Sequence, residues 1–200
     1  GYGNDDYCLL AKRLIKNAIK NEDVDIHFVP GGTPCNILAH SIALRPYEAV
    51  ISADTGHINV HETGAIEAKG HKILTTPNRD GKIDPFEIVK IIEKHPDEHM
   101  VKPKMVFITN PTELGTVYTL DEVRLIRQIC DKYGLYLYMD GARLSTALAS
   151  LGNTLRLEDI AELTDMFYIG GTKNGALLGE AFVICNDDLK ENFRYYLKQN

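Results

Sequence analysis

The chain alternates short apolar runs with longer stretches in which apolar residues recur at helical spacing. Near the start, Leu10, Leu14 and Ile15 recur among basic residues, which predicts an amphipathic helix at residues 6–20. The next apolar run predicts a strand at residues 25–29, because it stops at Pro30-Gly31-Gly32. These two patterns then repeat along the chain.

Short apolar runs predict strands at residues 25–29, 49–52, 71–74, 104–108, 135–139, 165–169 and 181–184. Helical spacing predicts helices at residues 6–20, 33–44, 57–69, 84–95, 120–133, 144–151, 157–163 and from about 187 onward. Thr33 is the expected N-cap of its helix, with Pro34 at the first helical position, and Gly134 is the expected stop signal after residue 133.

This sustained alternation of strand and helix predicts an α/β fold. We expect a three-layer sandwich, in which helices cover both faces of a mostly parallel central sheet. Ligands in such folds bind outside the carboxyl ends of the strands. The residues that directly follow predicted strands are Gly31-Gly32-Thr33, Asn110, Asp140 and Lys173. The candidates for chemistry therefore collect on one edge of the sheet.

Composition narrows the class of protein. The 200 residues, 44% of them hydrophobic and 25% charged, are enough for one large soluble domain with a real core. The net charge of −6 and the lack of a basic run argue against nucleic acid as the partner. No apolar run approaches the length of about 18 residues that a membrane span needs.

The cysteines indicate a cellular compartment, and the two ends of the sequence indicate whether it is part of a longer chain. Cys8, Cys35, Cys130 and Cys185 are scattered without zinc spacing, so we expect reduced thiols and a cytoplasmic protein. The sequence opens at Gly1 and stops at Asn200 inside a helical pattern. We therefore expect it to be part of a longer chain.

Gly31-Gly32-Thr33 could hold a phosphate group. Glycine lets a phosphate approach the backbone, the helix N-terminus offers N–H groups and partial positive charge, and Thr33 adds a hydroxyl. The segment could equally be a plain turn with a threonine cap. Because the chain has neither a Gly-x-Gly-x-x-Gly nor a Walker pattern here, dinucleotides and nucleoside triphosphates are disfavoured.

Asp140 and Lys173 each allow two interpretations. Asp140 ends an apolar strand and could bind a cation, or it could cap the helix that comes next. Arg143 adds a fixed positive charge to the same turn. Lys173 has no acidic neighbour within five residues. It could lie on a solvated turn, or its nitrogen could form a Schiff base with a carbonyl cofactor.

His57 and His61 lie one helical turn apart, with Glu62 next to them. This spacing is typical of a metal face, but Ile58 stands where a zinc-protease motif has its glutamate. We therefore predict no metal. A flat imidazole that stacks on an aromatic cofactor, or accepts a proton, suits His57 better.

Taken together, these motifs resemble one family. The series GGT at 31–33, ADTGHINVHETGA at 53–65, PTELGT at 111–116, DGAR at 140–143 and GGTK at 170–173 covers nearly the whole chain in order. It resembles the pyridoxal-phosphate enzymes of fold type I, and within them the threonine aldolase and beta-eliminating lyase group.

The resemblance implies a role for each motif. Lys173 would carry pyridoxal 5'-phosphate as a Schiff base and later move protons at the substrate. Asp140 would pair with the pyridine nitrogen and make the ring an electron sink. Arg143 would bind near the cofactor's phenolic oxygen or the substrate carboxylate.

Three further positions complete the implied site. His57 would stack on the cofactor ring, while Gly32 and Thr33 would hold the phosphate. Many threonine aldolases have a histidine in the loop before Gly-Thr-Val, where this chain has residues 110–114 without one. His61 or Glu113 would then meet the substrate hydroxyl instead.

The implied function is a lyase that cleaves a β-hydroxy amino acid such as threonine into glycine and an aldehyde. The alternatives are β-elimination or transamination on the same cofactor, a non-catalytic paralogue, and a phosphate-sugar enzyme without pyridoxal. Residues 1–200 would form the cofactor-binding large domain, with a C-terminal small domain outside the sequence. By analogy the protein would be a homodimer or homotetramer.

Overall fold

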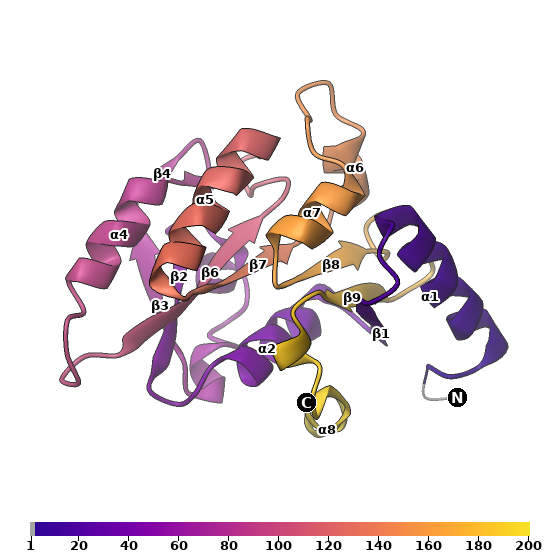
Figure 1. Ribbon diagram of the computed structural model, residues 1–200, viewed down its shortest axis with the longest axis horizontal. Coiled ribbons are helices and arrows are strands. Elements are labelled where there is room, and N and C mark those ends of the chain that lie inside the picture. The colour runs from indigo at the N-terminus through magenta and orange to yellow at the C-terminus, as the bar shows by residue number, and fades with distance from the viewer. Residues whose placement is uncertain (1–2) are drawn as a thin grey trace.

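The computed structural model describes residues 3–200, in which one seven-stranded sheet forms the centre of the molecule (Figure 1). The strands are β1 (Asp25–Val29), β2 (Glu48–Ala53), β3 (Lys72–Thr76), β6 (Lys102–Thr109), β7 (Tyr136–Asp140), β8 (Met166–Gly170) and β9 (Glu180–Ile184). Their order is β1-β9-β8-β7-β6-β2-β3. Only β9 runs against its neighbours, so the sheet is mostly parallel, as predicted.

Helices cover both faces of this sheet. One face carries α1 (Asp6–Ile19), α4 (Pro85–Glu93), α5 (Leu120–Tyr133) and α7 (Leu157–Leu163), and the other carries α2 (Gly32–Ala43) and α8 (Phe193–Gln199) (Figure 1). Two short helices, α3 (His57–Val60) and α6 (Leu144–Leu148), come after β2 and β7. The three-layer sandwich predicted from the sequence is confirmed.

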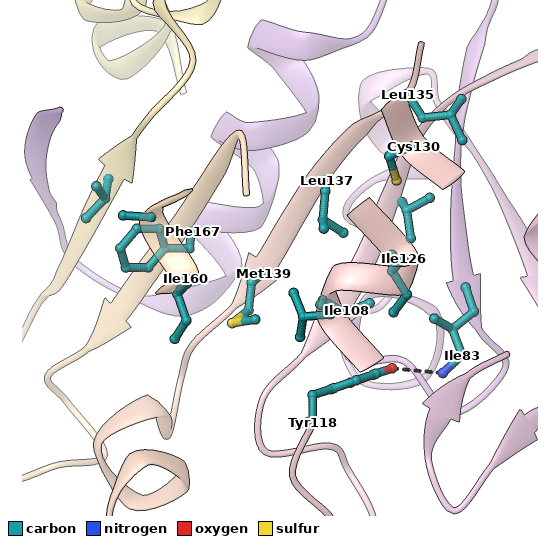
Figure 2. Close-up of a cluster of buried hydrophobic side chains, with 14 of the residues drawn as sticks. Ile83, Ile108, Tyr118, Ile126, Cys130, Leu135, Leu137, Met139, Ile160 and Phe167 are labelled. Atoms are coloured by element: carbon teal, nitrogen blue, oxygen red, sulfur yellow. Dashed lines mark hydrogen bonds between the residues drawn. The ribbon is translucent and has the colours of Figure 1, made fainter. Parts of the chain in front are cut away.

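Alternating side chains of the strands build a separate core on each face. Along β7, Leu137 and Met139 pack toward α5, whereas Tyr138 between them packs toward α2. Figure 2 shows the α5 side, where Leu137 and Met139 lie between Phe167 of β8 and Ile126 of α5. This period of two is the strand pattern that the sequence carries.

A small hairpin, β4 (Asn78–Arg79) and β5 (Lys82–Ile83), was not predicted. Its strands have two residues each, too few to produce an apolar run. The hairpin is fixed to the main body by the buried Tyr118, whose hydroxyl accepts a hydrogen bond from the Ile83 N–H at 2.8 Å (Figure 2). It therefore lies against the N-terminal end of α5.

Several predicted helix boundaries are wrong. Thr33 is not the N-cap of α2, because the helix already begins at Gly32 with Gly31 in the cap position and no side-chain cap. The helix predicted at residues 57–69 is helical only in α3 and a 3-10 turn at Glu67–Lys69, since Thr63 and Gly64 adopt left-handed conformations. Left-handed residues cannot continue a right-handed helix.

Other differences lie near helix ends, including that of α4, which stops at Glu93 rather than at residue 95. The helix predicted at 144–151 stops at Leu148. The last helix begins at Phe193 rather than near residue 187, where a short 3-10 turn ends before the left-handed Asn192.

None of the helices in residues 3–200 is both long and apolar enough to cross a membrane.

Candidate functional site

Asp140 is buried at the carboxyl end of β7, with 1% of its surface exposed. Its Oδ1 accepts hydrogen bonds from the Tyr168 hydroxyl at 2.6 Å and from the Ala142 N–H at 3.0 Å. Its Oδ2 accepts one from Asn36 Nδ2 at 3.1 Å. Three donors thus stabilise and orient a carboxylate. Asp140 does not cap α6, whose cap position is Arg143.

Asn36 joins this carboxylate to a second one. The fully buried amide lies on α2, and its Nδ2 also donates to Glu62 Oε1 at 2.6 Å. Its Oδ1 accepts from the Tyr138 hydroxyl at 2.8 Å. With one hydrogen for each carboxylate and one acceptor for a tyrosine, the amide holds Asp140 and Glu62 at a fixed separation.

Glu62 in turn binds His57. The His57 Nδ1 lies 2.8 Å from Glu62 Oε1, and the glutamate side chain is fully buried. This hydrogen bond raises the pKa of His57 above its ordinary value, against the opposing effect of partial burial, and the charges of Asp140 and Glu113 act in the same direction. The ring is therefore held in one orientation and favours its protonated form.

The polar atoms of His57, Glu62 and Asp140 all lie within 4.8 Å of one another, the arrangement of a metal site. The amide hydrogens of Asn36, however, point at both carboxylates. A donor that bridges the two acids takes the place in which a cation would bridge them. The cluster is better suited to bind a polar organic group.

Lys173 lies on the turn after β8, next to the turn that comes after Asp140. The N–H of Gly170 donates to Gly141 O at 2.9 Å, and Asn174 Nδ2 donates to Ala142 O at 3.0 Å and to Gly170 O at 2.8 Å. A Cβ at Gly170 would lie 2.1 Å from Ala142 O, so this glycine is required for the contact between the two turns.

The side chain of Lys173 is exposed. It makes no hydrogen bond or ion pair with any residue from 3 to 200. Asn174 thus fixes the backbone that carries this free amine beside the Asp140 turn. The contact explains why each of the motifs DGAR and GGTK has a glycine at this place, since a Cβ at Gly141 would also lie only 1.9 Å from Tyr168 O.

Gly32 supports Asp140 as well as starting a helix. A Cβ at Gly32 would lie 2.7 Å from the Tyr168 hydroxyl, the group that donates to Asp140. The first turn of α2 has no acidic residue and no side-chain cap, which leaves the N–H groups at Gly32 and Thr33 suited to an anion. The structure thereby gives Gly32 a second role that the sequence did not indicate.

The remaining candidates lie at the rim. His61 Nε2 is 3.9 Å from Glu113 Oε2, and the rings of His61 and His57 are 5.5 Å apart between centroids. Arg143 is exposed, and its side chain has no ion pair or hydrogen bond within the described part of the chain. It therefore does not pair with Asp140, although both lie on one turn.

Sequence reasoning missed three polar residues behind the site, Asn36, Tyr168 and the half-buried Asn174, and noted Glu62 only as a neighbour of the two histidines. The available signal was polarity among apolar neighbours, as for Asn36 between Cys35 and Leu38. Asn110 is a further buried polar residue at this edge. Its N–H donates to Asp140 O at 2.9 Å, and its Oδ1 accepts a hydrogen bond from Tyr118 N at 3.2 Å. Its buried Nδ2 has no partner in residues 3–200. An unpaired buried donor is costly unless a ligand meets it.

This edge of the sheet thus presents an oriented carboxylate, an imidazole, a free primary amine and a helix N-terminus for an anion. A model of the beta-eliminating lyase family matches residues 2–199. The chain belongs to the beta-eliminating lyase family. The family predicted from the five motifs is confirmed.

Threonine aldolases are similar to this chain over 99–100% of its length. The low specificity L-threonine aldolases of Pseudomonas sp. and Pseudomonas aeruginosa are 40% and 38% identical, each aligned to 99% of this chain. The structure of a Leishmania major threonine aldolase superposes with a TM-score of 0.98 at 53% identity. The chain spans 58% of the length of each of these three relatives.

More distant structures share the fold of this family member. Cystalysin from Treponema denticola, described as containing a pyridoxal 5'-phosphate cofactor, has a TM-score of 0.76 at 21% identity over the whole chain. At that identity the likeness concerns the fold alone. It agrees with the mostly parallel sandwich predicted from the alternation of strands and helices.

Proposed function

We propose that this family member binds pyridoxal 5'-phosphate at the carboxyl edge of its sheet and cleaves a β-hydroxy amino acid such as threonine into glycine and an aldehyde. The observation that carries the proposal is the Asp140 carboxylate, held by three donors beside the turn of a free lysine. The threonine aldolases to which the chain is similar support the choice of substrate.

The residues at the site fit this cofactor. Asp140 Oδ2 accepts only one hydrogen bond from the described residues, so a lone pair is left for a protonated ring nitrogen. The unpaired Nδ2 of Asn110 lies on the strand end next to Asp140 and can donate to a polar group of the ring. The N-terminus of α2, with Thr33, is chemically suited to the phosphate.

When bound, the cofactor supplies an aldehyde that condenses with amines and a ring that accepts an electron pair from a bond at Cα. Asp140 keeps a proton on the ring nitrogen, because a buried anion stabilises the cation. His57 would lie against one face of the ring and exclude water from that side. Lys173 would hold the cofactor through its Nζ, and the same amine would be the group that moves a proton at Cα.

His61 and Glu113 are proposed to meet the substrate hydroxyl. The loop after β6 contains no histidine, but its Glu113 faces His61 at 3.9 Å across the rim. In this pair His61 takes the proton from the hydroxyl as the Cα–Cβ bond breaks, and Glu113 stabilises the resulting imidazolium. Arg143, free of partners in residues 3–200, is available for the cofactor's phenolic oxygen or the substrate carboxylate.

Three proposals concern the whole protein. The first is that residues 1–200 form the cofactor-binding large domain, with a C-terminal small domain outside them. The protein is a homodimer or homotetramer and resides in the cytoplasm. Size-exclusion chromatography with light scattering on the full-length protein tests the assembly directly.

The reaction is tested on full-length protein supplied with pyridoxal phosphate. With threonine we expect glycine and acetaldehyde, and Lys173→Ala should lose both this turnover and the visible absorbance of the bound cofactor. Pyruvate and ammonia from serine or cysteine would instead indicate β-elimination. Bound cofactor without turnover on a panel of amino acids would indicate a non-catalytic paralogue, and protein that takes up no cofactor would contradict the proposal.

A further inference from the structure

Glu62 is a carboxylate that stability alone does not explain. Its side chain is fully buried, and its Oε2 has no hydrogen-bond partner among the described residues. A buried carboxylate with an unpaired oxygen costs free energy, and an uncharged residue of similar size would cost less. The position therefore calls for an explanation from its one charged contact, which is His57.

The geometry of that contact fixes the ring. Glu62 Oε1 accepts from His57 Nδ1 at 2.8 Å, while Asn36 Nδ2 binds the same oxygen at 2.6 Å. Because Asn36 also binds Asp140, the glutamate cannot move without disturbing the amide between the two acids. The ring of His57 is thus tied through Glu62 to α2 and β7, although its own segment is a short helix followed by left-handed turns.

The charges around His57 all act in one direction. Glu62 contacts it directly, Asp140 faces it from the end of β7, and Glu113 faces it from the loop after β6. On its own segment His61 lies 5.5 Å away between ring centroids, and Asn36 on α2 is neutral. Acids therefore outnumber bases around a half-buried imidazole, which favours its cationic form.

We propose that Glu62 is a positioning residue that fixes the His57 ring against the bound cofactor and supplies the negative charge that stabilises the protonated form of that ring. The effect on the cofactor rests on the proposed function, whereas the contact between Glu62 and His57 does not. A fixed imidazolium over the ring would withdraw electron density from it, in the same sense as the ring proton held by Asp140. In this role Glu62 acts through His57, so it is a positioning residue and not a catalytic one.

Glu62→Gln separates charge from shape in the test. Glutamine keeps an oxygen that can accept from His57 Nδ1, but it removes the negative charge. Glu62→Ala removes both the charge and the hydrogen bond. Glu67→Gln is the matched control, because it makes the same change on an exposed residue of the same segment.

The first readout needs neither cofactor nor turnover. In the cofactor-free full-length protein, an NMR titration of His57, assigned with His57→Asn, should give a lower pKa in Glu62→Gln than in the parent. Glu67→Gln should leave it unchanged. An unchanged pKa of His57 in Glu62→Gln would overturn the proposal, whatever reaction the enzyme catalyses.

The second readout is the pH profile of kcat/KM in the loaded enzyme. Loss of a protonated His57 forms the basic limb of this profile, so the limb should move to lower pH in Glu62→Gln. Glu62→Ala should lose more in kcat than Glu62→Gln because its ring is also unfixed. Lower thermal stability with the parent's profile would mean that Glu62 is merely structural, and that result would also refute the proposal.

The two readouts separate this inference from the proposed function. If cofactor binding and turnover fail in the parent protein but the pKa of His57 responds to Glu62→Gln, only the proposed function is lost. If the parent turns over threonine and neither readout responds, only the role of Glu62 is lost.

Discussion

At the residue scale, the site depends on side chains that support others. Asp140 was identifiable from the sequence because it ends an apolar strand. Asn36 and Tyr168 were not, because their importance comes from contacts with residues 26 to 104 positions away. Local sequence patterns identify the residue at the end of a strand, whereas hydrogen bonds between distant segments require the folded chain.

Gly32 gives a prediction at this scale. Gly32→Ala adds a Cβ 2.7 Å from the Tyr168 hydroxyl and so displaces the donor of Asp140. We expect a loss of about 1–3 kcal/mol in unfolding free energy, as for other overpacked positions, together with weaker cofactor binding. Chemical denaturation and a cofactor titration measure the two effects.

Gly31→Ala is the matched control for this variant. Its Cβ would meet only Pro34 Cδ at 3.7 Å, and its φ of −175° suits any residue. Equal losses from the two substitutions would show that the Tyr168 contact is not what requires glycine at position 32.

At the element scale, the carboxyl ends of β7 and β8 act as one unit. The strands themselves were predicted to within one or two residues, because apolar runs between turn signals are a strong local pattern. The contact between the turns after these two strands was not, although the glycines of DGAR and GGTK are its signature. The segment at 57–69 was predicted as helix because its apolar spacing is helical, but left-handed residues at 63 and 64 divide it.

Asn174 gives a prediction at the element scale. Asn174→Ala removes two hydrogen bonds, to Ala142 O and Gly170 O, that hold the Lys173 turn beside Asp140. Two ordinary hydrogen bonds contribute about 1–3 kcal/mol together, so the dissociation constant for pyridoxal phosphate should rise between about fivefold and a hundredfold. Equilibrium titration of the visible absorbance measures this constant.

The control for Asn174 lies on α6. Thr146→Ala removes only a long hydrogen bond of 3.3 Å to the Asn174 oxygen, so its cofactor affinity should stay near that of the parent. An Asn174→Ala variant that binds the cofactor as tightly as Thr146→Ala would contradict a positioning role for Asn174.

At the scale of the whole molecule, strand order could not be predicted. The first strand, β1, pairs with the last, β9, and β9 lies between β1 and β8. Apolar runs predict that strands exist, but they do not specify their partners. The fold class was predictable because the alternation of strand and helix extends over nearly the whole chain, and the order of strands is what brings Gly32 next to Tyr168.

Burial of His40 on α2 and partial burial of His27 on β1 predict how the free energy of unfolding depends on pH. Burial lowers the pKa of His40 to about 4, while its unfolded value is near 6.5. Unfolded chains therefore bind the proton more readily, so stability is complete above pH 6.5 and falls as pH drops toward 4. His27 adds a similar effect, since burial also lowers its pKa to about 4.

Chemical denaturation of His40→Gln and its parent at pH 7 and pH 5 measures the His40 contribution. The parent should lose about 2 kcal/mol more than the variant between these pH values. His99→Gln, at an exposed position, should behave like the parent. Equal losses in the parent and His40→Gln would contradict the neutral, buried state of His40.

The central claim is that Lys173 carries the cofactor at the edge of the sheet beside Asp140. Reduction of the full-length, cofactor-loaded protein with sodium borohydride, followed by proteolysis and mass spectrometry, would locate the attached pyridoxyl group. The account predicts that this group is on Lys173 alone. A pyridoxyl group on any other lysine, or on none, would contradict it.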